Sequence, residues 1–158
     1  DGENTSTVTD NQLAIIRGRK IGFIFQKFNL MPSMNAVKNI ALPMVFLGGS
    51  KTEREQRAFE LLGKVGLTNW ATHRPSELSG GQQQRIAIAR ALMNNPAIIL
   101  ADEPTGNLDT KTGEQIMELL VSLNREGKTI LLVTHAIALK RFANRVVNML
   151  DGEVTEDT

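Results

Sequence analysis

A carboxylate pair follows a stretch of the sequence that is predicted to be a buried strand. Asp102 and Glu103 come directly after the apolar run of residues 97–101. Ligands of open α/β sheets lie beyond the carboxyl ends of the strands, so this position suits a metal and a base. We expect Asp102 to hold Mg²⁺ through water, and Glu103 to orient or deprotonate an attacking water. The alternative is that the pair is only a polar strand exit.

The most informative part of the sequence is the glycine-rich stretch of residues 78–85. Ser79, Gly80 and Gly81 stand where a helix is predicted to begin. Glycines allow close approach of the backbone, and the unpaired N–H groups and the dipole at a helix start favour an anion. The whole stretch therefore indicates phosphate binding, whereas its first residues alone also fit an ordinary junction between a loop and a helix.

Two further polar residues follow predicted strands. His135 ends the strand after the carboxylate pair, and its spacing from Glu103 fits one strand, one helix and another strand. We therefore expect His135 at the same edge of the sheet as Asp102. Gln26 follows an earlier apolar run and is interpreted either as a metal or water ligand or as a residue without a chemical role. His73 has no such neighbours and is predicted to be structural.

Alternating strands and amphipathic helices must position these residues, and this pattern indicates a parallel sheet built from crossover units. The predicted strands are residues 21–25, 97–101, 129–133 and 145–150, the last followed by a turn at residues 151–152. The predicted helices are residues 52–65, 79–93, a segment after Asp109 that carries Ile116, Leu119, Leu120 and Leu123, and residues 136–142. Because residues 97–101 are continuously apolar, we expect that strand to be covered on both faces.

Two consecutive helices are predicted after the first strand, and they suggest a helical insertion. The first is predicted to be capped by Ser33, to carry Val37 and Ile40 on its apolar side, and to be bent or broken near Pro43. The second is predicted to end near Gly66.

The composition excludes several classes of function. Among 158 residues, 18 Lys and Arg stand against 17 Asp and Glu, so the net charge of +1 gives no nucleic-acid footprint. The absence of cysteine excludes disulfides, thiolate chemistry and Cys-ligated metals. The longest apolar run, residues 40–47, is interrupted by Pro43 and is far shorter than the ~20 residues of a membrane-spanning helix. We expect a cytoplasmic chain, and we interpret its start at Asp1, without a signal peptide, as a truncation.

In combination and order, these residues resemble the motifs of ABC transporter nucleotide-binding domains. The matching positions are Gln26 for the Q-loop, residues 78–82 for the signature motif, Asp102 and Glu103 for Walker B, residues 107–109 for the D-loop and His135 for the H-loop. Residues 25–30 and 102–109 are most similar to the lipoprotein-release and macrolide-export branch of that family.

The resemblance implies an α/β fold of the P-loop NTPase (ABC ATPase) type. Its parallel sheet core would carry an inserted helical subdomain, with the first part of the domain missing. Residues 1–25 would be a remnant of the N-terminal part of the core. Residues 26–95 would form the helical subdomain with the Q-loop and signature motif, and residues 96–158 the C-terminal part of the core.

The resemblance also implies ATP and Mg²⁺ as cofactors and assigns roles to site residues. The signature residues, which would bind the γ-phosphate of ATP held by a partner domain, are Leu78, Ser79, Gly80, Gly81 and Gln82. The catalytic and metal assignments are Asp102 for Mg²⁺, Glu103 for the general base, His135 for the γ-phosphate and the attacking water, and Gln26 for sensing Mg²⁺ and the γ-phosphate. The dimer-interface residues are Asn107, Leu108 and Asp109, although a plain helix N-cap at Asp109 or Thr110 is an alternative for that loop.

One motif of the family does not occur in these residues. No G-x-x-x-x-G-K-[ST] phosphate loop is present, and a domain without it cannot hold its own triphosphate, so the chain alone is predicted to be inactive. Gly127, Lys128 and Thr129 imitate the end of the motif. We reject this match because Ser122 stands where the earlier glycine is required and because the segment enters a strand.

The expected function is that of the ATP-binding and ATP-hydrolysing subunit of an ABC transporter, driven by dimerisation around two sandwiched nucleotides. The implied partners are membrane permease subunits and a second ATP-binding domain, in a homodimer, with no nucleic acid. The implied location is the cytoplasmic face of the membrane, bound through the permease. The alternatives are a non-catalytic docking or dimerisation module and a non-transport ABC ATPase.

Overall fold

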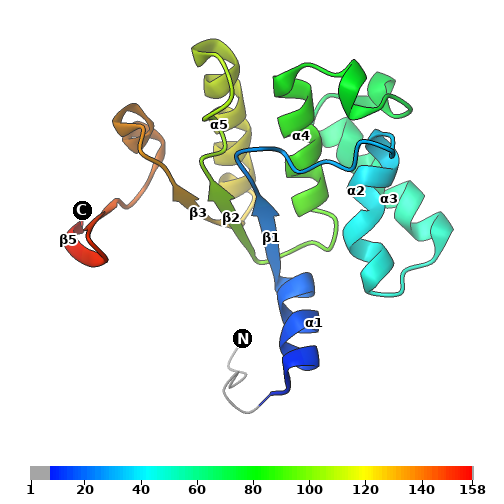
Figure 1. The fold of residues 1–158 in the computed structure, drawn as a ribbon, viewed down its shortest axis with the longest axis horizontal. Coiled ribbons are helices and arrows are strands. Elements are labelled where there is room, and N and C mark those ends of the chain that lie inside the picture. The colour runs from blue at the N-terminus through cyan, green and yellow to red at the C-terminus, as the bar shows by residue number, and fades with distance from the viewer. Residues whose placement is uncertain (1–7, 158) are drawn as a thin grey trace.

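Three parallel strands form the centre of the computed structural model, which describes residues 8–157. The strands pair in the order β1-β2-β3, and helices connect them (Figure 1). The central elements are β1 (Ile21–Ile24), β2 (Ile98–Asp102), β3 (Thr129–Val133), α4 (Gly80–Ala91) and α5 (Thr110–Arg125). This is the α/β class that the sequence predicted, and its parallel pairing brings the carboxyl ends of all three strands to one edge.

One face of the sheet is packed against helices and the other is open. Ile99 and Ala101 of β2 are buried in a core to which α4 and α5 contribute. Ile98 on the opposite face is 39% exposed, and Leu131 of β3 is 57% exposed. Side chains alternate between the two faces of a strand, so apolar character at every position does not by itself mean two covered faces. Within residues 8–157, the prediction that this strand is covered on both faces is wrong.

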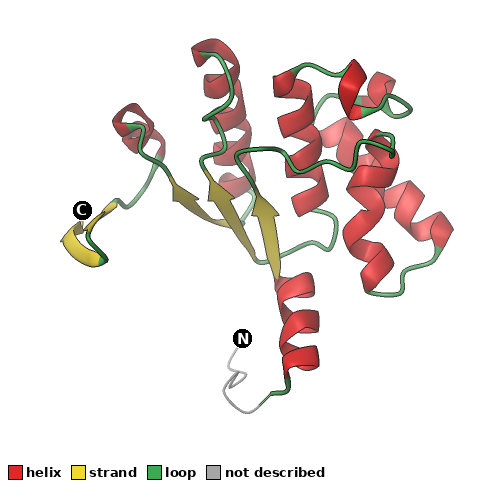
Figure 2. Cartoon of the chain, in the orientation of Figure 1, coloured by secondary structure: helices red, strands yellow, loops and turns green. Residues whose placement is uncertain are grey.

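A group of helices lies beside β1. α2 (Ala36–Phe46) and α3 (Lys51–Lys64) contact each other and α4, and Figure 2 shows all three on the side of the sheet away from β3. Ile40, Leu61 and Leu62 are buried between them. The two consecutive helices predicted after the first strand are therefore present.

The start and the interior of α2 differ from the prediction. Asn35, not Ser33, is the N-cap, because its side chain accepts a hydrogen bond of 3.0 Å from the backbone N–H of Lys38. The preceding segment is held by the buried Asn39, whose Oδ1 accepts a 2.7 Å bond from the N–H of Met31. Pro43 lies inside α2, which continues to Phe46, so of the predicted bend or break at this proline the break does not occur.

The helix α3 follows the sequence signals closely. Ser50 and Glu53 form a reciprocal capping box at its start, with 2.9 Å between the N–H of Ser50 and the Glu53 carboxylate. Gly66, with φ of +73°, follows its end as predicted. Two short 3₁₀ turns, Thr68–Trp70 and Pro75–Glu77, then lead to α4. His73 lies between them against Trp70, with 4.7 Å between ring centroids, and has the structural position predicted for it.

A helix that the sequence analysis did not predict precedes β1. α1 (Asp10–Lys20) has no buried residue, so packing against the core does not define an apolar side for it. Thr9 and Gln12 form a capping box, with a bond of 2.8 Å from the N–H of Thr9 to the Gln12 side chain. This Thr-x-x-Gln pattern was the available signal for a helix start. The first seven residues of the predicted 1–25 segment, and Thr158, lie outside the described residues.

The C-terminal part forms a separate small sheet. β4 (Val147–Leu150) and β5 (Glu153–Asp157) pair antiparallel around the turn predicted at Asp151 and Gly152, whose φ angles are +49° and +86°. The predicted helix at 136–142 is a 3₁₀ helix, Ile137–Phe142, without buried residues. No helix within residues 8–157 is long and apolar enough to cross a membrane.

Gly22 in β1 and Gly63 in α3 offer a matched pair of stability tests. A Cβ at Gly22 would overlap the backbone carbonyl of Ala91, whereas a Cβ at Gly63 would meet its nearest atom, Oγ1 of Thr68, at 3.8 Å. We predict that Gly22→Ala lowers the free energy of unfolding by about 1–3 kcal/mol. Gly63→Ala should raise it by roughly 0.5 kcal/mol because alanine is the better helix former. Urea unfolding of both variants tests this; an unchanged midpoint for Gly22→Ala contradicts the tight packing.

Candidate functional site

The first residue after β2, Glu103, has a left-handed backbone conformation. Its φ is +44°, which is uncommon for a residue other than glycine. Its N–H donates to the carbonyl of Val133 at 2.9 Å, and its own carbonyl accepts from the N–H of Gly106 at 3.0 Å. The first bond extends the pairing of β2 with β3 by one residue, and the second closes a turn. Together they point the Glu103 side chain along the end of β3.

The carboxylate of Glu103 is fixed by two hydrogen bonds from the segment after β3. The hydroxyl of Thr134 donates to Oε2 at 3.1 Å, and the backbone N–H of His135 donates to Oε1 at 2.6 Å. Nε2 of His135 lies 4.0 Å from Oε1 of Glu103. The Glu103 side chain is 19% exposed and the His135 imidazole is fully exposed. The predicted meeting of these two residues at one sheet edge is therefore observed. Each carboxylate oxygen keeps a further lone pair for a water.

Gln26 lies against the loop that follows Glu103. The side-chain amide of Asn107 donates to the backbone carbonyl of Gln26 at 2.8 Å. A Cβ added to Gly106 would lie 2.7 Å from Nε2 of Gln26, so this glycine gives room to the glutamine side chain. The loop after β1 is therefore attached to the loop after β2.

Asp102 is the last residue of β2 and is exposed, opposite Val133 of β3. Within the described residues, no group of three or more acidic or histidine side chains could hold a metal by itself. Mg²⁺ keeps several of its waters and takes one or two carboxylates together with substrate phosphates. The exposed carboxylate of Asp102 and the side-chain oxygen of Gln26 are a donor set that fits this mode of binding.

The signature stretch begins α4 with a capping box. The hydroxyl of Ser79 accepts from the N–H of Gln82 at 3.3 Å, and the N–H of Ser79 donates to the Gln82 side chain at 2.8 Å. The N–H of Gln83 bonds to the carbonyl of Ser79 at 2.9 Å. Within residues 8–157, the N–H groups of Gly80 and Gly81 have no such acceptor. Ser79 is exposed, so these two amides are available to an anion.

Both glycines also have a packing role that the sequence analysis did not foresee. A Cβ on Gly81 would lie 2.5 Å from Cγ2 of Thr112 in α5, and a Cβ on Gly80 would lie 3.3 Å from Cδ2 of Leu108. The start of α4 therefore lies close against the loop before α5 and its first turn. Leu78, just before this start, is buried in the core.

The loop of residues 107–109 has a structural role beside the interface role that the resemblance implies. Asp109 is the N-cap of α5 and accepts a 3.0 Å bond from the N–H of Thr112. Hydrogen bonding from the side chain of Thr112, and then from its backbone N–H, lowers the pKa of the Asp109 carboxyl, because it favours the ionised form. Leu108 is partly buried against the core. The N-cap at Asp109, the alternative left open by the sequence, is thus present.

Two residues of α4 hold the candidate site and were missed from the sequence. Gln84 donates from Nε2 to the carbonyl of Pro104 at 2.6 Å. Arg90 donates to the carbonyls of Phe28, at 2.8 Å, and of Asn29, which have φ of +52° and +50°. Burial lowers the pKa of the Arg90 guanidinium, since it penalises the charged form. The available signal was that Gln84 and Arg90 lie at helical spacing from the apolar residues of α4, on the side expected to be buried.

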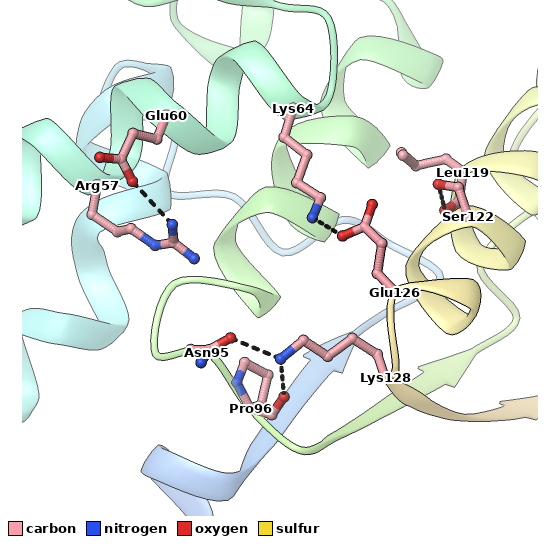
Figure 3. Close-up of polar contacts among 9 residues, drawn as sticks. All are labelled: Arg57, Glu60, Lys64, Asn95, Pro96, Leu119, Ser122, Glu126 and Lys128. Atoms are coloured by element: carbon pink, nitrogen blue, oxygen red, sulfur yellow. Dashed lines mark hydrogen bonds and ion pairs between the residues drawn. The ribbon is translucent and has the colours of Figure 1, made fainter.

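The rejected phosphate-loop match at Gly127 and Lys128 is a turn between α5 and β3. Gly127 has φ of +93°, and Nζ of Lys128 donates to Oδ1 of Asn95 at 2.7 Å and to the carbonyl of Pro96 at 2.9 Å (Figure 3). The lysine therefore holds the loop before β2, at the end of the sheet opposite to Glu103. Figure 3 also shows the ion pair of Lys64 with Glu126, which links α3 to the end of α5.

A parallel sheet with a carboxylate and a histidine at its carboxyl edge, faced by a glycine-opened helix, is the arrangement of an α/β P-loop NTPase fold. The ABC transporter family model matches residues 2–106. The chain is 54% identical over 154 residues to an uncharacterized ABC transporter ATP-binding protein of Bacillus subtilis, covering 98% of this chain and 67% of that protein. It belongs to the ABC transporter family, as an ATP-binding domain.

Other relatives extend this finding. The chain is 51% identical over 158 residues to a macrolide export ATP-binding/permease protein of Mannheimia succiniciproducens, covering all of this chain and 25% of that protein. A dimeric ATP-binding cassette of Methanocaldococcus jannaschii, solved with ADP and Pi, superposes with a TM-score of 0.85 at 50% identity. That match covers 100% of this chain and 70% of the cassette. The chain thus spans about two thirds of the separate ATP-binding relatives and a quarter of the fused one.

The two carbonyls bonded by Arg90 allow a test of its role in holding the loop after β1. Arg90→Lys keeps the charge but cannot reach both carbonyls with a planar fork. We expect it to lower the free energy of unfolding by about 1–2 kcal/mol. Arg85→Lys on the same helix is the control, because Arg85 makes one long bond of 3.4 Å to the carbonyl of Val65. Equal unfolding midpoints for the two variants contradict this role.

Proposed function

We propose that the chain forms part of an ATP-hydrolysing subunit that drives an ABC transporter through a nucleotide-sandwich dimer. The observation that carries this proposal is the Glu103 carboxylate, held by Thr134 and the N–H of His135 at the open edge of the sheet. A fixed, partly exposed carboxylate with free lone pairs is suited to accept a proton from water. Membership in the ABC transporter family supports the assignment of that water to the hydrolysis of ATP.

The other residues at this edge receive roles consistent with their positions. We assign Glu103 as general base and His135, whose exposed imidazole lies 4.0 Å from the Glu103 carboxylate, to the γ-phosphate and the attacking water. Asp102 and Gln26 would hold Mg²⁺, which supplies charge neutralisation on the phosphates when it is bound. Gln26 would also connect the nucleotide to the helices α2, α3 and α4, because its loop is attached to the turn after Glu103.

The signature residues act on a nucleotide that a second domain holds. The free N–H groups of Gly80 and Gly81, the exposed Ser79 and the dipole of α4 suit a γ-phosphate approached from outside the domain. Leu78 and Gln82 position this start, one through burial and the other through the capping box. The dimeric state named for the solved cassette supports a homodimer, and we assign the loop of residues 107–109 to its interface.

The partner outside this dimer would be a membrane permease. One relative is named as an ATP-binding/permease protein, so its name joins both functions in a single protein. This supports a permease partner for the chain and a place at the cytoplasmic face of the membrane. Within this assembly we retain the predicted division of the chain into a helical part and an ATPase core. Residues 26–95 are the helical part that communicates with the permease, and residues 1–25 and 96–158 belong to the ATPase core.

Replacement of the proposed base separates hydrolysis from binding. In a domain that includes the phosphate loop of the family, Glu103→Gln keeps an acceptor for Thr134 or the N–H of His135 but cannot take up a proton. We predict that kcat falls by about 100-fold or more, and that dimerisation driven by ATP persists in size-exclusion chromatography. Glu118→Gln, at an exposed position of α5, is the control and should keep full turnover. A Glu103→Gln protein with normal turnover removes Glu103 from the role of base.

The 158-residue chain alone is predicted to hydrolyse no ATP above background. Its sequence contains no loop of backbone amides and lysine for the β- and γ-phosphates, so Glu103 has no bound triphosphate to act on. Phosphate release by the purified chain, compared with the domain that includes the loop, measures this. Robust turnover by the chain alone would require another triphosphate site.

A further inference from the structure

Gln84 is a fully buried amide in the middle of α4. Its exposed fraction is 0%, and it shares the buried side of the helix with Ala87 and Ile88. Its Nε2 donates to the carbonyl of Pro104 at 2.6 Å, across 20 residues of sequence. Its Oε1 is buried without a hydrogen-bond partner. The position therefore has one strong polar contact, which goes to the residue directly after Glu103.

The unpartnered oxygen means that the amide is held at this position at a cost in free energy. An apolar side chain of similar size, such as methionine, would remove that oxygen but would leave the buried carbonyl of Pro104 without its donor. The amide orientation is set by the carbonyl of Pro104, because the reversed amide would place two acceptors together. What Gln84 specifically provides is a donor for that carbonyl.

The Pro104 carbonyl belongs to the turn that orients the proposed base. Glu103 has φ of +44°, and a residue before proline is disfavoured in the helical regions of backbone space. A backbone in such a conformation persists where its surroundings hold it. Val133 holds the turn from the side of β3, and Gly106 closes it. Gln84 holds it from the opposite side, that of α4.

The same helix begins with the signature residues. Ser79 and Gln84 belong to the first turn and a half of α4, so the start of the helix and the Gln84 contact move as one unit. Under the proposed function, on which this step rests, Ser79 meets the nucleotide of the partner domain while Glu103 serves the nucleotide of its own domain. The Gln84 contact connects the helix that follows Ser79 to the turn that carries Glu103.

We infer that Gln84 is a positioning residue for Glu103, which sets the direction of the base through the Pro104 carbonyl and ties it to the position of the signature helix. Its side chain is fully buried and reaches the Glu103 turn only through that backbone carbonyl. Its loss should therefore leave nucleotide binding intact and reduce the chemical step.

The test uses a domain that includes the phosphate loop of the family. Gln84→Met removes the donor and the unpartnered oxygen while keeping the volume. We expect kcat to fall tenfold to a hundredfold, as for a misplaced catalytic group, with KM for ATP within threefold of wild type. Gln115→Met is the control, because Gln115 is exposed on α5, outside the proposed site, and the variant should keep kcat within twofold. If Gln84→Met does not fold, Gln84→Asn, whose amide is too short to reach Pro104, replaces it.

Two results would overturn the inference. One is a folded Gln84 variant with kcat within twofold of wild type, which reduces Gln84 to a packing residue. The other is an equal loss in Gln115→Met, which shows that the effect is not specific to the Gln84 contact. Dimerisation by ATP in the Glu103→Gln, Gln84→Met double variant provides the binding readout, and it should match Glu103→Gln alone. A Glu103→Gln protein that hydrolyses ATP normally instead refutes the proposed base, so the two failures are distinguishable.

Discussion

The backbone bond from the N–H of Glu103 to the carbonyl of Val133 is the interaction on which the candidate site depends. It prolongs the parallel pairing of β2 and β3 past the end of β2, while the left-handed turn at Glu103 sends the chain away from the sheet. The carboxylate is thereby left over the end of β3, where Thr134 and the N–H of His135 bind it. A chain that left β2 in an extended conformation would carry this side chain away from those donors.

The loop that starts at this turn meets every other part of the site. Its Pro104 receives Gln84 of α4, its Asn107 reaches the carbonyl of Gln26 after β1, and its Leu108 lies against Gly80. Asp109 then ends the loop by capping α5. Seven residues from Glu103 to Asp109 thus connect the ends of two strands to the starts of two helices. The contacts of this loop with α4 are the bond from Gln84 to the Pro104 carbonyl and the approach of Leu108 to Gly80.

The sequence could predict what depends on local pattern and could not predict what depends on distant contacts. The strands β2 and β3 and the helices α3 and α5 follow from their apolar spacing, and the meeting of Glu103 with His135 follows from parallel connection. The polar helix α1 has no apolar stripe, and the open face of the sheet carries the same residue types as the covered face. The bonds of Gln84 and Arg90 join residues 20 and 62 positions apart, which no periodicity reveals.

The glycines of the signature stretch illustrate why packing and ligand binding need not compete as explanations. Without a Cβ, Gly81 lets the start of α4 approach Thr112, and this contact fixes where the helix begins relative to α5. The N–H groups of Gly80 and Gly81 point along the helix axis, away from that contact, because the first amides of a helix have no partner within it. The capping box of Ser79 and Gln82 satisfies the next amide and leaves these two for an anion. The same missing side chains therefore place the helix and expose its amides, so close packing against α5 is part of how the proposed phosphate site is formed.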